Sequence, residues 1–466
     1  MPAVPDQVLT VAQMRAAEEA LIAAGSSVDK LMQIAGRGAA EWVWRVAAGR
    51  SVTVLCGPGN NGGDGYVIAE SIRTRGGSVS VIAATDAKTD AARNARALFG
   101  GQVTGPDDAA KGEIFVDCLF GSGLTRALSD EHIALLSRLA ASHSYRIAID
   151  VPSGVESDSG AMFNAGLPPF DLTVALGAWK QAHFLMPASA TMGHLRLVGI
   201  GVGQVEGAAA LVRQPSLQAP TADAHKYRRG LLGVVAGTMP GAALLSARSA
   251  QGAGAGYVKL LDSAPSRVPV DIVSDTRALS ASLADKRWSA VLVGPGLGRH
   301  AAARDALVEV LAQPVPAVLD ADALMLLLPN FVAGRSHPLI ATPHEGEFAA
   351  MEAAFGLGGE GSKPDRALAL AQASGMVIVA KGPDSVIAAP DGRIAFSHRA
   401  SSWLSTAGTG DVLAGTIASR LASGVAPFEA ACQGVWLHGE AARLAGAAFT
   451  AGKLAESVGA AYAACL

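Results

Sequence analysis

Short β-branched runs alternate with longer alanine-rich stretches along the chain from Ser51 onward. Each short run ends in a turn that carries glycine, and a stretch with the composition of a helix follows. This alternation predicts a parallel sheet covered by helices, because neighbouring parallel strands need a long crossover connection. The predicted fold class is therefore α/β.

The alternation is interrupted once, which predicts two domains. Residues 211–224 (LVRQPSLQAPTADA) have little apolar periodicity and contain two prolines. This composition predicts a linker between a domain at residues 1–210 and a second at residues 225–466.

The predicted elements are as follows. The first domain has helices at Ala12–Ala24 and Val28–Arg45, and strands at Val52–Leu55, Val79–Ala83, Glu113–Val116, Arg146–Ile149 and Leu172–Leu176. The second has strands at Leu231–Ala236, Tyr257–Leu261, Ala290–Val293, Ala317–Leu319, Leu339–Ala341 and Met376–Ala380, then an edge hairpin of Ser385–Ala389 and Arg393–Phe396. Helix is predicted again toward the C-terminus.

Composition excludes several classes of protein. The 466 residues include 37 Lys and Arg against 40 Asp and Glu, a net charge of −3, whereas a nucleic-acid coat protein or a polybasic membrane binder would be strongly cationic. The four cysteines are dispersed and form no CxxC pair, which argues against a disulfide framework or a zinc site. No signal-peptide pattern and no apolar run of membrane-spanning length appears. We expect a cytoplasmic protein with no membrane or nucleic-acid partner, and a homo-oligomer formed through its alanine-rich helices.

A glycine-rich loop, GPGNNGGDG at residues 57–65, follows the first strand of the predicted sheet. It satisfies GxGxxG, which is typical of dinucleotide binding, but the acidic residue expected about 20 positions later is represented only by Asp86, somewhat late. The loop also contains Asn60, Asn61 and Asp64, which a plain pyrophosphate cradle does not require. We therefore expect binding through side chains as well as backbone.

Two further strands of the first domain end in aspartate, Asp117 in VDCLFGSGLTR and Asp150 in AIDVPSG. The carboxyl ends of parallel strands converge on the crevice where ligands bind, so these carboxylates are expected beside the glycine-rich loop. The alternative is that each one only caps a helix or forms an Asx turn. Asp150 precedes the rigid turn Pro152-Ser153-Gly154 and is the candidate general acid or base.

These motifs, together with DLTVALGAWK, resemble the NAD(P)H-hydrate epimerase domain over about residues 10–205. The resemblance implies a Rossmann-like three-layer α/β sandwich with Asp150 as the catalytic residue and a potassium ion held by Asn61, Asp117 and Ser153. It further implies a site for the hydrated cofactor lined by Asn60, Asn61, Gly62, Gly63, Asp64, Gly121, Ser122, Gly123, Leu124, Thr125, Arg126, Ala127 and Asp150. Oxygen ligands suit such a hard cation. Because the hydrated ring carbon bears both nitrogen and hydroxyl, reversible ionisation there scrambles its configuration, and one carboxylate that carries a proton suffices.

The strongest local signal of the second domain is AGTGD at residues 407–411, directly before a helical stretch. Glycines at a helix N-terminus leave backbone N–H groups free to bind an anion. Asp411 at the same place is the candidate base that takes a proton from an attacking hydroxyl while those N–H groups neutralise a transferred phosphoryl group. The alternative is an ordinary first-turn aspartate that interacts with the helix dipole. A P-loop is absent from the sequence.

Three more strand ends of the second domain carry candidate binding residues. Lys381 opens the loop KGPDS, where it either meets a nucleotide phosphate or remains a solvated surface charge. The loop GPGLG at residues 294–298 allows close approach of a ligand. His344 lies in ATPHEGEF at the end of a further strand. A lone histidine is usually structural, but a position at the carboxyl end of a strand raises the odds of a functional role.

The motifs HKYRRGLLGVVAGTMPGAAL, GAGAGYVKL, GPGLG, LDADAL, TPHEGE, the KG loop and AGTGD resemble the nucleotide-dependent NAD(P)H-hydrate dehydratase of the ribokinase-like superfamily, over about residues 225–465. The resemblance implies a ribokinase-like α/β domain that uses ADP to dehydrate the S hydrate, with NAD(P)H, AMP and phosphate as products. It implies contacts to the hydrate from Ala253 (or Ala255), Gly296, His344 and Asp411, and to the nucleotide from Lys381, Gly382, Pro383, Asp384, Ser385 and Gly410. Mg²⁺ is expected for phosphoryl transfer, although no ligand pair stands out.

Two departures from that family's pattern are visible. Glu345 stands where the family usually has proline, which bears on the loop that holds His344. The segment HKYRRG replaces the usual Lys-Gly-acidic pattern, so no role is carried over to Lys226.

The leading hypothesis is a fused enzyme whose first domain interconverts the R and S hydrates and whose second dehydrates the S form. One alternative is an ATP-dependent kinase of a small hydroxylated metabolite with a dinucleotide-sensing N-terminal domain. Another makes the N-terminal domain a non-catalytic binding or scaffolding module. NADH hydrate and NADPH hydrate are not distinguished, because no clear ribose-reading acid or 2′-phosphate-reading arginine stands out.

Overall fold

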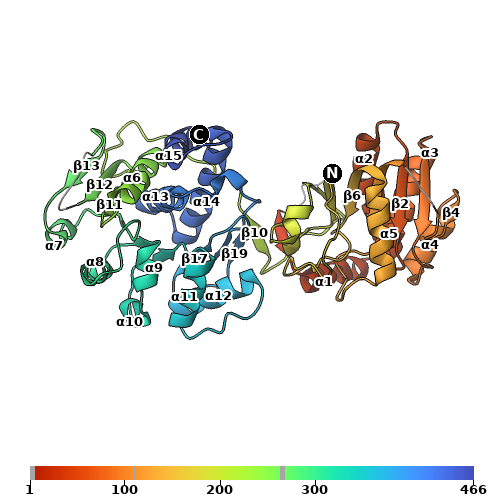
Figure 1. Cartoon of the computed structure of the whole chain (residues 1–466), viewed down its shortest axis with the longest axis horizontal. Coiled ribbons are helices and arrows are strands. Elements are labelled where there is room, and N and C mark those ends of the chain that lie inside the picture. The colour runs from red at the N-terminus through yellow and green to blue at the C-terminus, as the bar shows by residue number, and fades with distance from the viewer. Residues whose placement is uncertain (1–5, 109–111, 263–267) are drawn as a thin grey trace. The chain divides into compact units, whose positions relative to one another are not determined.

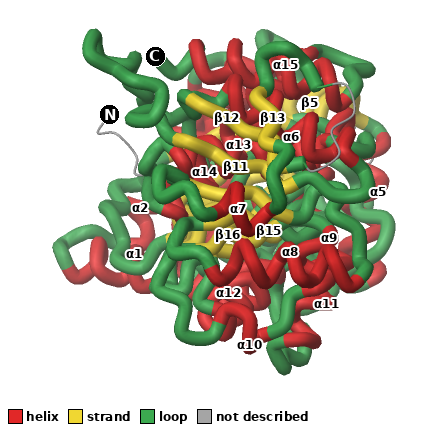
Figure 2. The backbone as a smooth tube through the Cα atoms, turned by 90° about the vertical axis from the view of Figure 1, so that its left-hand side faces the viewer, coloured by secondary structure: helices red, strands yellow, loops and turns green. Residues whose placement is uncertain are grey.

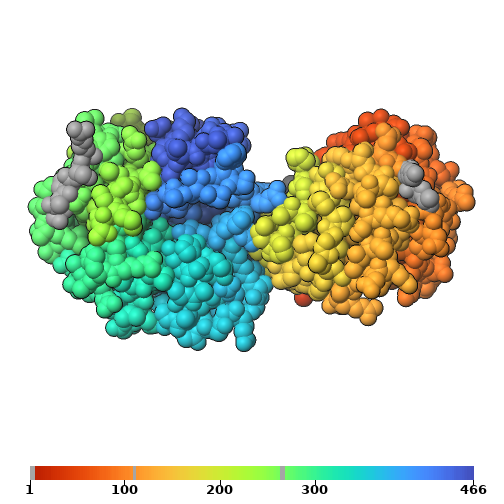
Figure 3. All heavy atoms as spheres, viewed as in Figure 1, coloured from red at the N-terminus to blue at the C-terminus, as the bar shows by residue number. Residues whose placement is uncertain are grey.

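The computed structural model describes residues 6–108, 112–262 and 268–466. The chain divides into two compact units, Met1–Ala210 and Leu211–Leu466, which Figure 3 colours from red to yellow and from yellow-green to blue. Both units are built from a sheet with helices packed on it, so the predicted α/β class is confirmed (Figure 1). Among the described residues, no helix combines the length and the apolar character needed to cross a membrane.

The sheet of the first unit is parallel throughout its described strands. Their order is β4 (Val103–Thr104), β3 (Val79–Ala83), β2 (Val52–Cys56), β5 (Gly112–Cys118), β6 (His143–Ile149), β7 (Leu172–Leu176) and β9 (His194–Val198). Because the central strands are covered on both faces, they are continuous apolar runs rather than alternating ones.

Helices cover both faces of this sheet. One face carries Val54 and Val116 and packs on α2 (Val28–Ala47), α3 (Asn60–Thr74) and α4 (Asp90–Leu98). The other carries Leu55 and Phe115 and packs on α5 (Asp130–Ala141). Neighbouring residues of a strand point to opposite faces, so each strand contributes to both cores. The predicted three-layer sandwich is confirmed.

A small ribbon in the first unit was not predicted from the sequence. Strand β1 (Gln7–Leu9) pairs in parallel with β8 (Trp179–Lys180) and antiparallel with β10 (Ala209–Leu211). Helix α1 (Val11–Ala23) starts directly after β1, where Thr10 and Gln13 form a capping box. The ribbon thereby fixes the start of α1 beside Lys180. Short helices η1 (Gln181–His183) and η2 (Ala188–Thr191) follow β8.

The second unit has a mixed sheet. Its strands run in the order β13 (Val273–Asp275), β12 (Tyr257–Leu261), β11 (Leu231–Val235), β14 (Ala290–Val293), β15 (Ala317–Leu319), β16 (Leu339–Ala341), β17 (Val377–Ala380), β18 (Val386–Ala388) and β19 (Ile394–Phe396). The pairs from β13 to β17 are parallel, and β17, β18 and β19 pair antiparallel, which confirms the predicted edge hairpin.

Helices lie on both sides of these strands (Figure 2). One face packs on α6 (Pro240–Gly252), α13 (Thr409–Ala422) and α14 (Pro427–Ala445), with α15 (Ala451–Ala463) against α6 and α14. The other side carries α8 (Ala301–Ala312), α9 (Asp322–Leu326), α10 (Pro329–Val332), α11 (Glu345–Ala354) and α12 (Lys363–Ser374). Helix α7 (Leu279–Leu283) and the 3-10 turn η3 (Ser402–Leu404) complete the described elements.

Residues 211–224, for which a linker is predicted, begin by packing on the second unit. The Val212 N–H donates to the Phe396 carbonyl over 2.8 Å, and the Leu217 N–H donates to the Cys465 carbonyl over 2.9 Å. Val212 and Leu217 are both buried. Two apolar side chains are enough to hold this stretch on the surface of the unit, although they give no periodic pattern.

Helices α6 and α13 approach closely because α13 has a glycine at their contact. A Cβ at Gly415 would lie 2.1 Å from the Ser246 carbonyl oxygen and 2.3 Å from the Ser249 Oγ. This contact matters for function because α13 begins with the AGTGD motif.

We therefore expect Gly415→Ala to destabilise the second unit by about 1–3 kcal/mol, because the new methyl group meets backbone that cannot move aside. Gly439→Ala is the matched control: Gly439 lies within α14, is exposed, and has open space around it, so alanine should stabilise the helix by about 0.5–1 kcal/mol. Hydrogen exchange of the second unit's helices during urea unfolding measures both changes. Equal effects of the two substitutions would contradict the close contact.

Candidate active sites

The first unit contains a cavity of about 700 Å³ at the carboxyl ends of its central strands. The loops that follow β2, β5 and β6 line it, and one face of α1 forms another wall. This is the place where a parallel α/β sheet binds ligands. The predicted residues that line the cavity are Asn60, Asn61, Asp64, Gly121, Ser122, Gly123, Leu124, Thr125, Arg126 and Asp150.

Gly62, Gly63 and Ala127 are not among the cavity-lining residues. A Cβ at Gly62 would lie 1.9 Å from the Gly57 carbonyl oxygen, and one at Gly63 would lie 2.5 Å from the Met32 Cε. These two glycines therefore allow the loop and α3 to pack, while the neighbouring Asn61 and Asp64 face the cavity. Their predicted contact with substrate stays a prediction.

Asp150 forms a buried ion pair at the centre of this cavity. The Lys180 Nζ donates to its Oδ1 over 2.5 Å, and the Ser122 N–H donates to its Oδ2 over 3.0 Å. Burial raises the pKa of Asp150, but the charge and hydrogen bond of Lys180, with the bonds from Ser122, lower it to about 2. Asp150 is therefore ionised at neutral pH. Its backbone has a φ of 69°, a conformation that side-chain-bearing residues rarely adopt.

His183 supports the backbone of Asp150. The Lys180 N–H donates to the His183 Nδ1 over 2.9 Å, so the ring carries its proton on Nε2, which donates to the Asp150 carbonyl over 2.8 Å. Burial and the nearby Lys180 lower the pKa of His183 to about 4, so the ring is neutral at physiological pH.

The three residues predicted to hold potassium are buried close to this site. The Ser153 Oγ donates to the Asp117 Oδ1 over 2.8 Å, and the Ser153 N–H donates to Oδ2 over 3.0 Å. Burial raises the pKa of Asp117 to about 6, although the hydrogen bonds from Leu119 and Ser153 lower it. Both amide atoms of Asn61 are buried without a hydrogen-bond partner among the described residues.

Glu18 and Lys180 line the same cavity without having been assigned from the sequence. Burial raises the pKa of Glu18, and burial also raises the pKa of Asp64 well above its usual range. Glu18, Asp64 and Asp150 thus all interact electrostatically with the buried Lys180. Lys180 lies in the quoted motif DLTVALGAWK, but its partner is 30 residues away, and only the fold reveals the pair.

In the second unit, Asp411 lies in the first turn of α13, which starts after Gly408 with a φ of 93°. Burial and the charge of Asp320 raise the pKa of Asp411 to about 6, while Lys381 lowers it. A Cβ at Gly410 would lie 3.5 Å from the Lys381 Nζ, so the AGTGD motif and the KG loop meet. The structure therefore brings together Asp411, Gly410 and Lys381, and their contacts to the hydrate and the nucleotide stay predictions.

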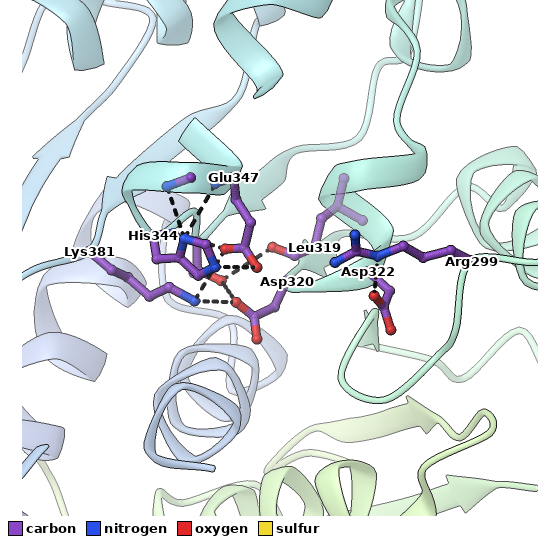
Figure 4. A network of polar contacts seen from close by, with 9 residues as sticks. Arg299, Leu319, Asp320, Asp322, His344, Glu347 and Lys381 are labelled. Atoms are coloured by element: carbon purple, nitrogen blue, oxygen red, sulfur yellow. Dashed lines mark hydrogen bonds and ion pairs between the residues drawn. The ribbon is translucent and has the colours of Figure 1, made fainter. Parts of the chain in front are cut away.

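Lys381 is the centre of a network of carboxylates (Figure 4). Its Nζ donates to the Asp320 Oδ1 over 2.7 Å and lies 3.8 Å from the Glu347 Oε2. The Thr342 Oγ donates to the same Asp320 oxygen over 2.6 Å. Burial lowers the pKa of Lys381, but Asp320 and Glu347 raise it above its usual value, so the lysine is charged.

His344 joins this network as the N-cap of α11. The ring Nδ1 of His344 accepts from the Gly346 N–H over 3.0 Å, and the backbone N–H of His344 donates to the Glu347 Oε2 over 2.9 Å. Glu345, which stands in place of the family's proline, accepts from Arg366 of α12 over 2.9 Å. Glutamate in place of the family's proline therefore leaves the N-cap of α11 intact, and the Glu345 side chain links α11 to α12.

The loop that contains Gly296 is held against α6. A Cβ at Gly296, whose φ is 64°, would lie 2.3 Å from the Met239 carbonyl oxygen and 3.1 Å from the Ala242 Cβ. Asp322 fixes the end of this loop by accepting from the Gly298 N–H over 2.9 Å. Glycine is therefore required at position 296 by the close approach of its backbone to Met239, whether or not a ligand also contacts it.

Ala253 lies elsewhere in the unit. It is fully buried in an apolar core cluster, and its carbonyl accepts from the Arg420 Nη1 over 3.1 Å. Ala255 is also buried, and its N–H donates to the Ser419 Oγ over 2.9 Å. The structure therefore does not place either residue in the network around Lys381, and the alanine that touches the Gly296 position is Ala242.

The loop 381–385 is clamped by Lys363, which was not assigned from the sequence. The Lys363 Nζ donates to the Asp384 Oδ1 over 2.6 Å and to the Asp384 carbonyl over 3.1 Å. The Ser385 Oγ closes the turn by donating to the Gly382 carbonyl over 3.1 Å. The predicted nucleotide loop thus has a fixed shape.

Asp320 and Glu347 belong to quoted motifs but were given no role. Asp320 directly follows β15, so the argument from strand ends that selected Asp150 would also have selected it. Glu347 lies three residues after His344, the N-cap of α11, and the two residues form a capping box. That spacing is the sequence signal that could have placed Glu347 beside His344.

Comparison with known proteins covers both units. The family described as NAD(P)H-hydrate dehydratase matches residues 232–462, and the family described as YjeF-related protein N-terminus matches residues 28–182. The bifunctional NAD(P)H-hydrate repair enzyme Nnr of Salinibacter ruber is 33% identical, with 94% of this chain and 92% of that protein aligned. The protein of the same name from Mycobacterium tuberculosis strain H37Rv is 34% identical over 91% of this chain and 90% of its own.

Among solved structures, similarity is found to the ADP/ATP-dependent NAD(P)H-hydrate dehydratase from Bacillus subtilis, co-crystallised with ATP and Mg²⁺. It is 28% identical, with 54% of this chain and 95% of that chain covered and a TM-score of 0.48.

Proposed function

Because the chain belongs to the family of bifunctional NAD(P)H-hydrate repair enzymes, we propose that its two units carry out consecutive repair reactions on hydrated NADH and NADPH. The first unit interconverts the R and S hydrates. The second dehydrates the S hydrate at the expense of a nucleotide, with ADP as the proposed donor and NAD(P)H, AMP and phosphate as products. The observation that carries the proposal is that each sheet ends in its own polar site, one with Asp150 and one with Asp411.

In the first unit, Asp150 is the proposed proton acceptor. The hydrated ring carbon bears a hydroxyl and the ring nitrogen, whose lone pair can expel the hydroxyl. Water that returns to the planar carbon on the opposite face gives the other epimer and must lose a proton. The ionised Asp150, held by Lys180 and Ser122, is placed to accept that proton.

We propose that Asn61, Asp117 and Ser153 hold a potassium ion. The unpartnered amide of Asn61 supplies an unused carbonyl oxygen, and Asp117 and Ser153 supply a carboxylate and a hydroxyl that already touch. Such oxygen ligands suit a hard monovalent cation. The bound ion would fix the loops that carry Asn61 and Ser153.

In the second unit, Asp411 is the proposed base for phosphorylation of the hydrate's hydroxyl. It takes the hydroxyl proton as the oxygen bonds to the transferred phosphorus, and the N–H groups at the start of α13 neutralise charge on the phosphoryl group. Phosphate is a better leaving group than hydroxide, so the ring nitrogen's lone pair then expels it and a proton loss restores the double bond.

Lys381 and the loop 381–385 are proposed to bind the nucleotide phosphates. Lys381 is charged and close to Gly410, and Lys363 keeps the loop in shape. Mg²⁺ is proposed to accompany the nucleotide, where it would neutralise phosphate charge; Asp320 and Glu347 are carboxylates beside Lys381 that suit it. A homo-oligomeric state and a cytoplasmic location stay predictions.

Separate substitution of the two aspartates tests the assignment of the two reactions. In Asp411→Asn, nucleotide-driven formation of NADH from the S hydrate should fall by about 10²–10⁴-fold while R and S still interconvert, because only the second base is lost. In Asp150→Asn, the S hydrate should be consumed while R persists. Chromatography of both epimers measures each rate. Equal loss of both activities in either variant would contradict the assignment.

The pH dependence tests the role of Asp411 as a base. Its pKa of about 6 predicts that kcat/KM of dehydration falls as the pH drops below about 6, because the protonated carboxyl cannot accept a proton. Lys381→Met removes the charge that lowers this pKa, so the acid limb should move to higher pH. An acid limb at the same pH in wild type and variant would contradict the coupling.

Potassium binding is tested through stability. At equal ionic strength, KCl should raise the unfolding temperature of the first unit above its value in NaCl, because an ion that binds the native state stabilises it. Ser153→Ala should abolish that difference, whereas Ser144→Ala, at an exposed position of β6, should preserve it. No difference between the salts in the wild type would overturn the proposed ion.

A further inference from the structure

Asp150 is already engaged as an acceptor on both carboxylate oxygens. Oδ1 accepts from the Lys180 Nζ over 2.5 Å and Oδ2 from the Ser122 N–H over 3.0 Å. Hydrogen bonds to the charged form favour it, so Asp150 is ionised and has no proton to supply. Interconversion also needs a proton donor, because hydroxide is a poor leaving group.

Helix α1 presents one face to the cavity. The residues of this face are Val11, Met14, Arg15, Glu18 and Ile22. Each lies three or four residues from another member of the set, which is the spacing of a single helical face. Three of the five are apolar, and Glu18 is the acid among them.

The position of this helix is fixed at its start. In the ribbon, Leu9 pairs with Lys180, and the Val11 N–H donates to the Asp158 Oδ1 over 2.8 Å. Met14 packs over the turn before β8, where a Cβ at Gly177 would lie 2.2 Å from the Met14 Cε. Glu18 follows Met14 by one helical turn, so it is held over the same part of the cavity.

Glu18 interacts electrostatically with charged groups on every side of the reactive region. These groups are Lys180 after β7, Asp150 after β6, Asp64 on α3 and Arg15 on α1 itself. Burial raises the pKa of Glu18, the charge of Lys180 lowers it, and Asp150 raises it. Glu18 is half-buried, so it can exchange its proton with solvent, whereas Asp64 is buried.

We propose that Glu18 is a further catalytic residue of the first unit, the acid that protonates the departing hydroxyl of the hydrated ring. This inference rests on the proposed epimerase function. The C–O bond breaks as the Glu18 proton joins the hydroxyl oxygen, water leaves, and the ring nitrogen's lone pair forms the C=N⁺ bond. Water then adds to the other face, its proton passes to Asp150, and the electron pair returns to nitrogen. One proton has moved from Glu18 to Asp150, and exchange with solvent restores both groups.

Glu18→Gln tests this role, because glutamine keeps the shape of the side chain but has no acidic proton. In the full chain, with the R hydrate of NADH and no nucleotide, kcat of interconversion should fall by about 100-fold. KM should stay within about threefold, because glutamine replaces the protonated acid without changing its charge or shape and leaves the walls of the cavity in place. The lost kcat should be partly recovered in Glu18→Asp, which restores an acid at this position.

The matched control is Glu19→Gln, which removes the neighbouring acid of the same helix. Glu19 is exposed and does not line the cavity, so this variant should interconvert the hydrates like the wild type. Thermal unfolding of both variants, monitored by hydrogen exchange of the first unit's amides, establishes that the unit remains folded.

The pH profile separates proton donation from a structural role. In the wild type, kcat of interconversion should fall on the alkaline side as Glu18 loses its proton, and Glu18→Gln should lack that limb. An unchanged limb with a lower kcat would overturn the proposal in favour of a structural role beside Lys180. Full activity of Glu18→Gln, or loss of the limb in Asp64→Asn instead, would also overturn it. A wild-type chain that does not interconvert the hydrates at all would contradict the proposed epimerase function itself.

Discussion

A lysine that pairs with a buried aspartate lies at the centre of each unit's site. Lys180 donates to Asp150 over 2.5 Å in the first unit, and Lys381 donates to Asp320 over 2.7 Å in the second. Burying such charges is costly unless each is paired and hydrogen-bonded, and removing one partner leaves an uncompensated charge. The carboxyl ends of the parallel strands bring these partners together, so the two sheets are the frames on which the chemistry depends.

The two ion pairs have different effects on the reactive aspartates. In the first unit the lysine bonds the reactive aspartate directly and keeps the pKa of Asp150 near 2, so the carboxylate is always ionised at neutral pH. In the second unit the lysine bonds Asp320, and burial together with the charge of Asp320 leaves the pKa of Asp411 at about 6. A carboxylate of that pKa is a stronger base near neutral pH than an ordinary aspartate. The carboxylate with which each lysine pairs thus sets the pKa of the reactive aspartate in that unit.

The central strands and the glycine-rich loops could be predicted from sequence, because each depends on local signals, whereas β4, β9, β13 and the ribbon were not predicted. The selection of Asp150 and Asp411 as reactive residues rests on the same kind of signal and stays a prediction. Runs such as Val52–Cys56 are β-branched and buried, and AGTGD marks the start of α13 by its glycines. Lys180 could not be predicted, since it lies in a two-residue strand and meets Asp150 only through the fold.

The roles of individual glycines and alanines were also beyond sequence reasoning. Gly62 and Gly63 are required by the packing of α3, although their motif also carries Asn61 and Asp64, and Ala253 lies in the core beside Arg420. A motif marks a segment, but the direction of each side chain depends on neighbours that are distant in sequence.

The central claim is that the first unit supplies the epimer that the second unit consumes. The most direct test gives the purified wild-type chain only the R hydrate of NADH, first without ADP and then with it, and follows both epimers by chromatography and NADH by absorbance. The S hydrate should appear before any nucleotide is added, and ADP should then drive all of the hydrate to NADH. If R persists unchanged in both stages while a separate sample of S is converted to NADH, the first unit does not perform the reaction assigned to it.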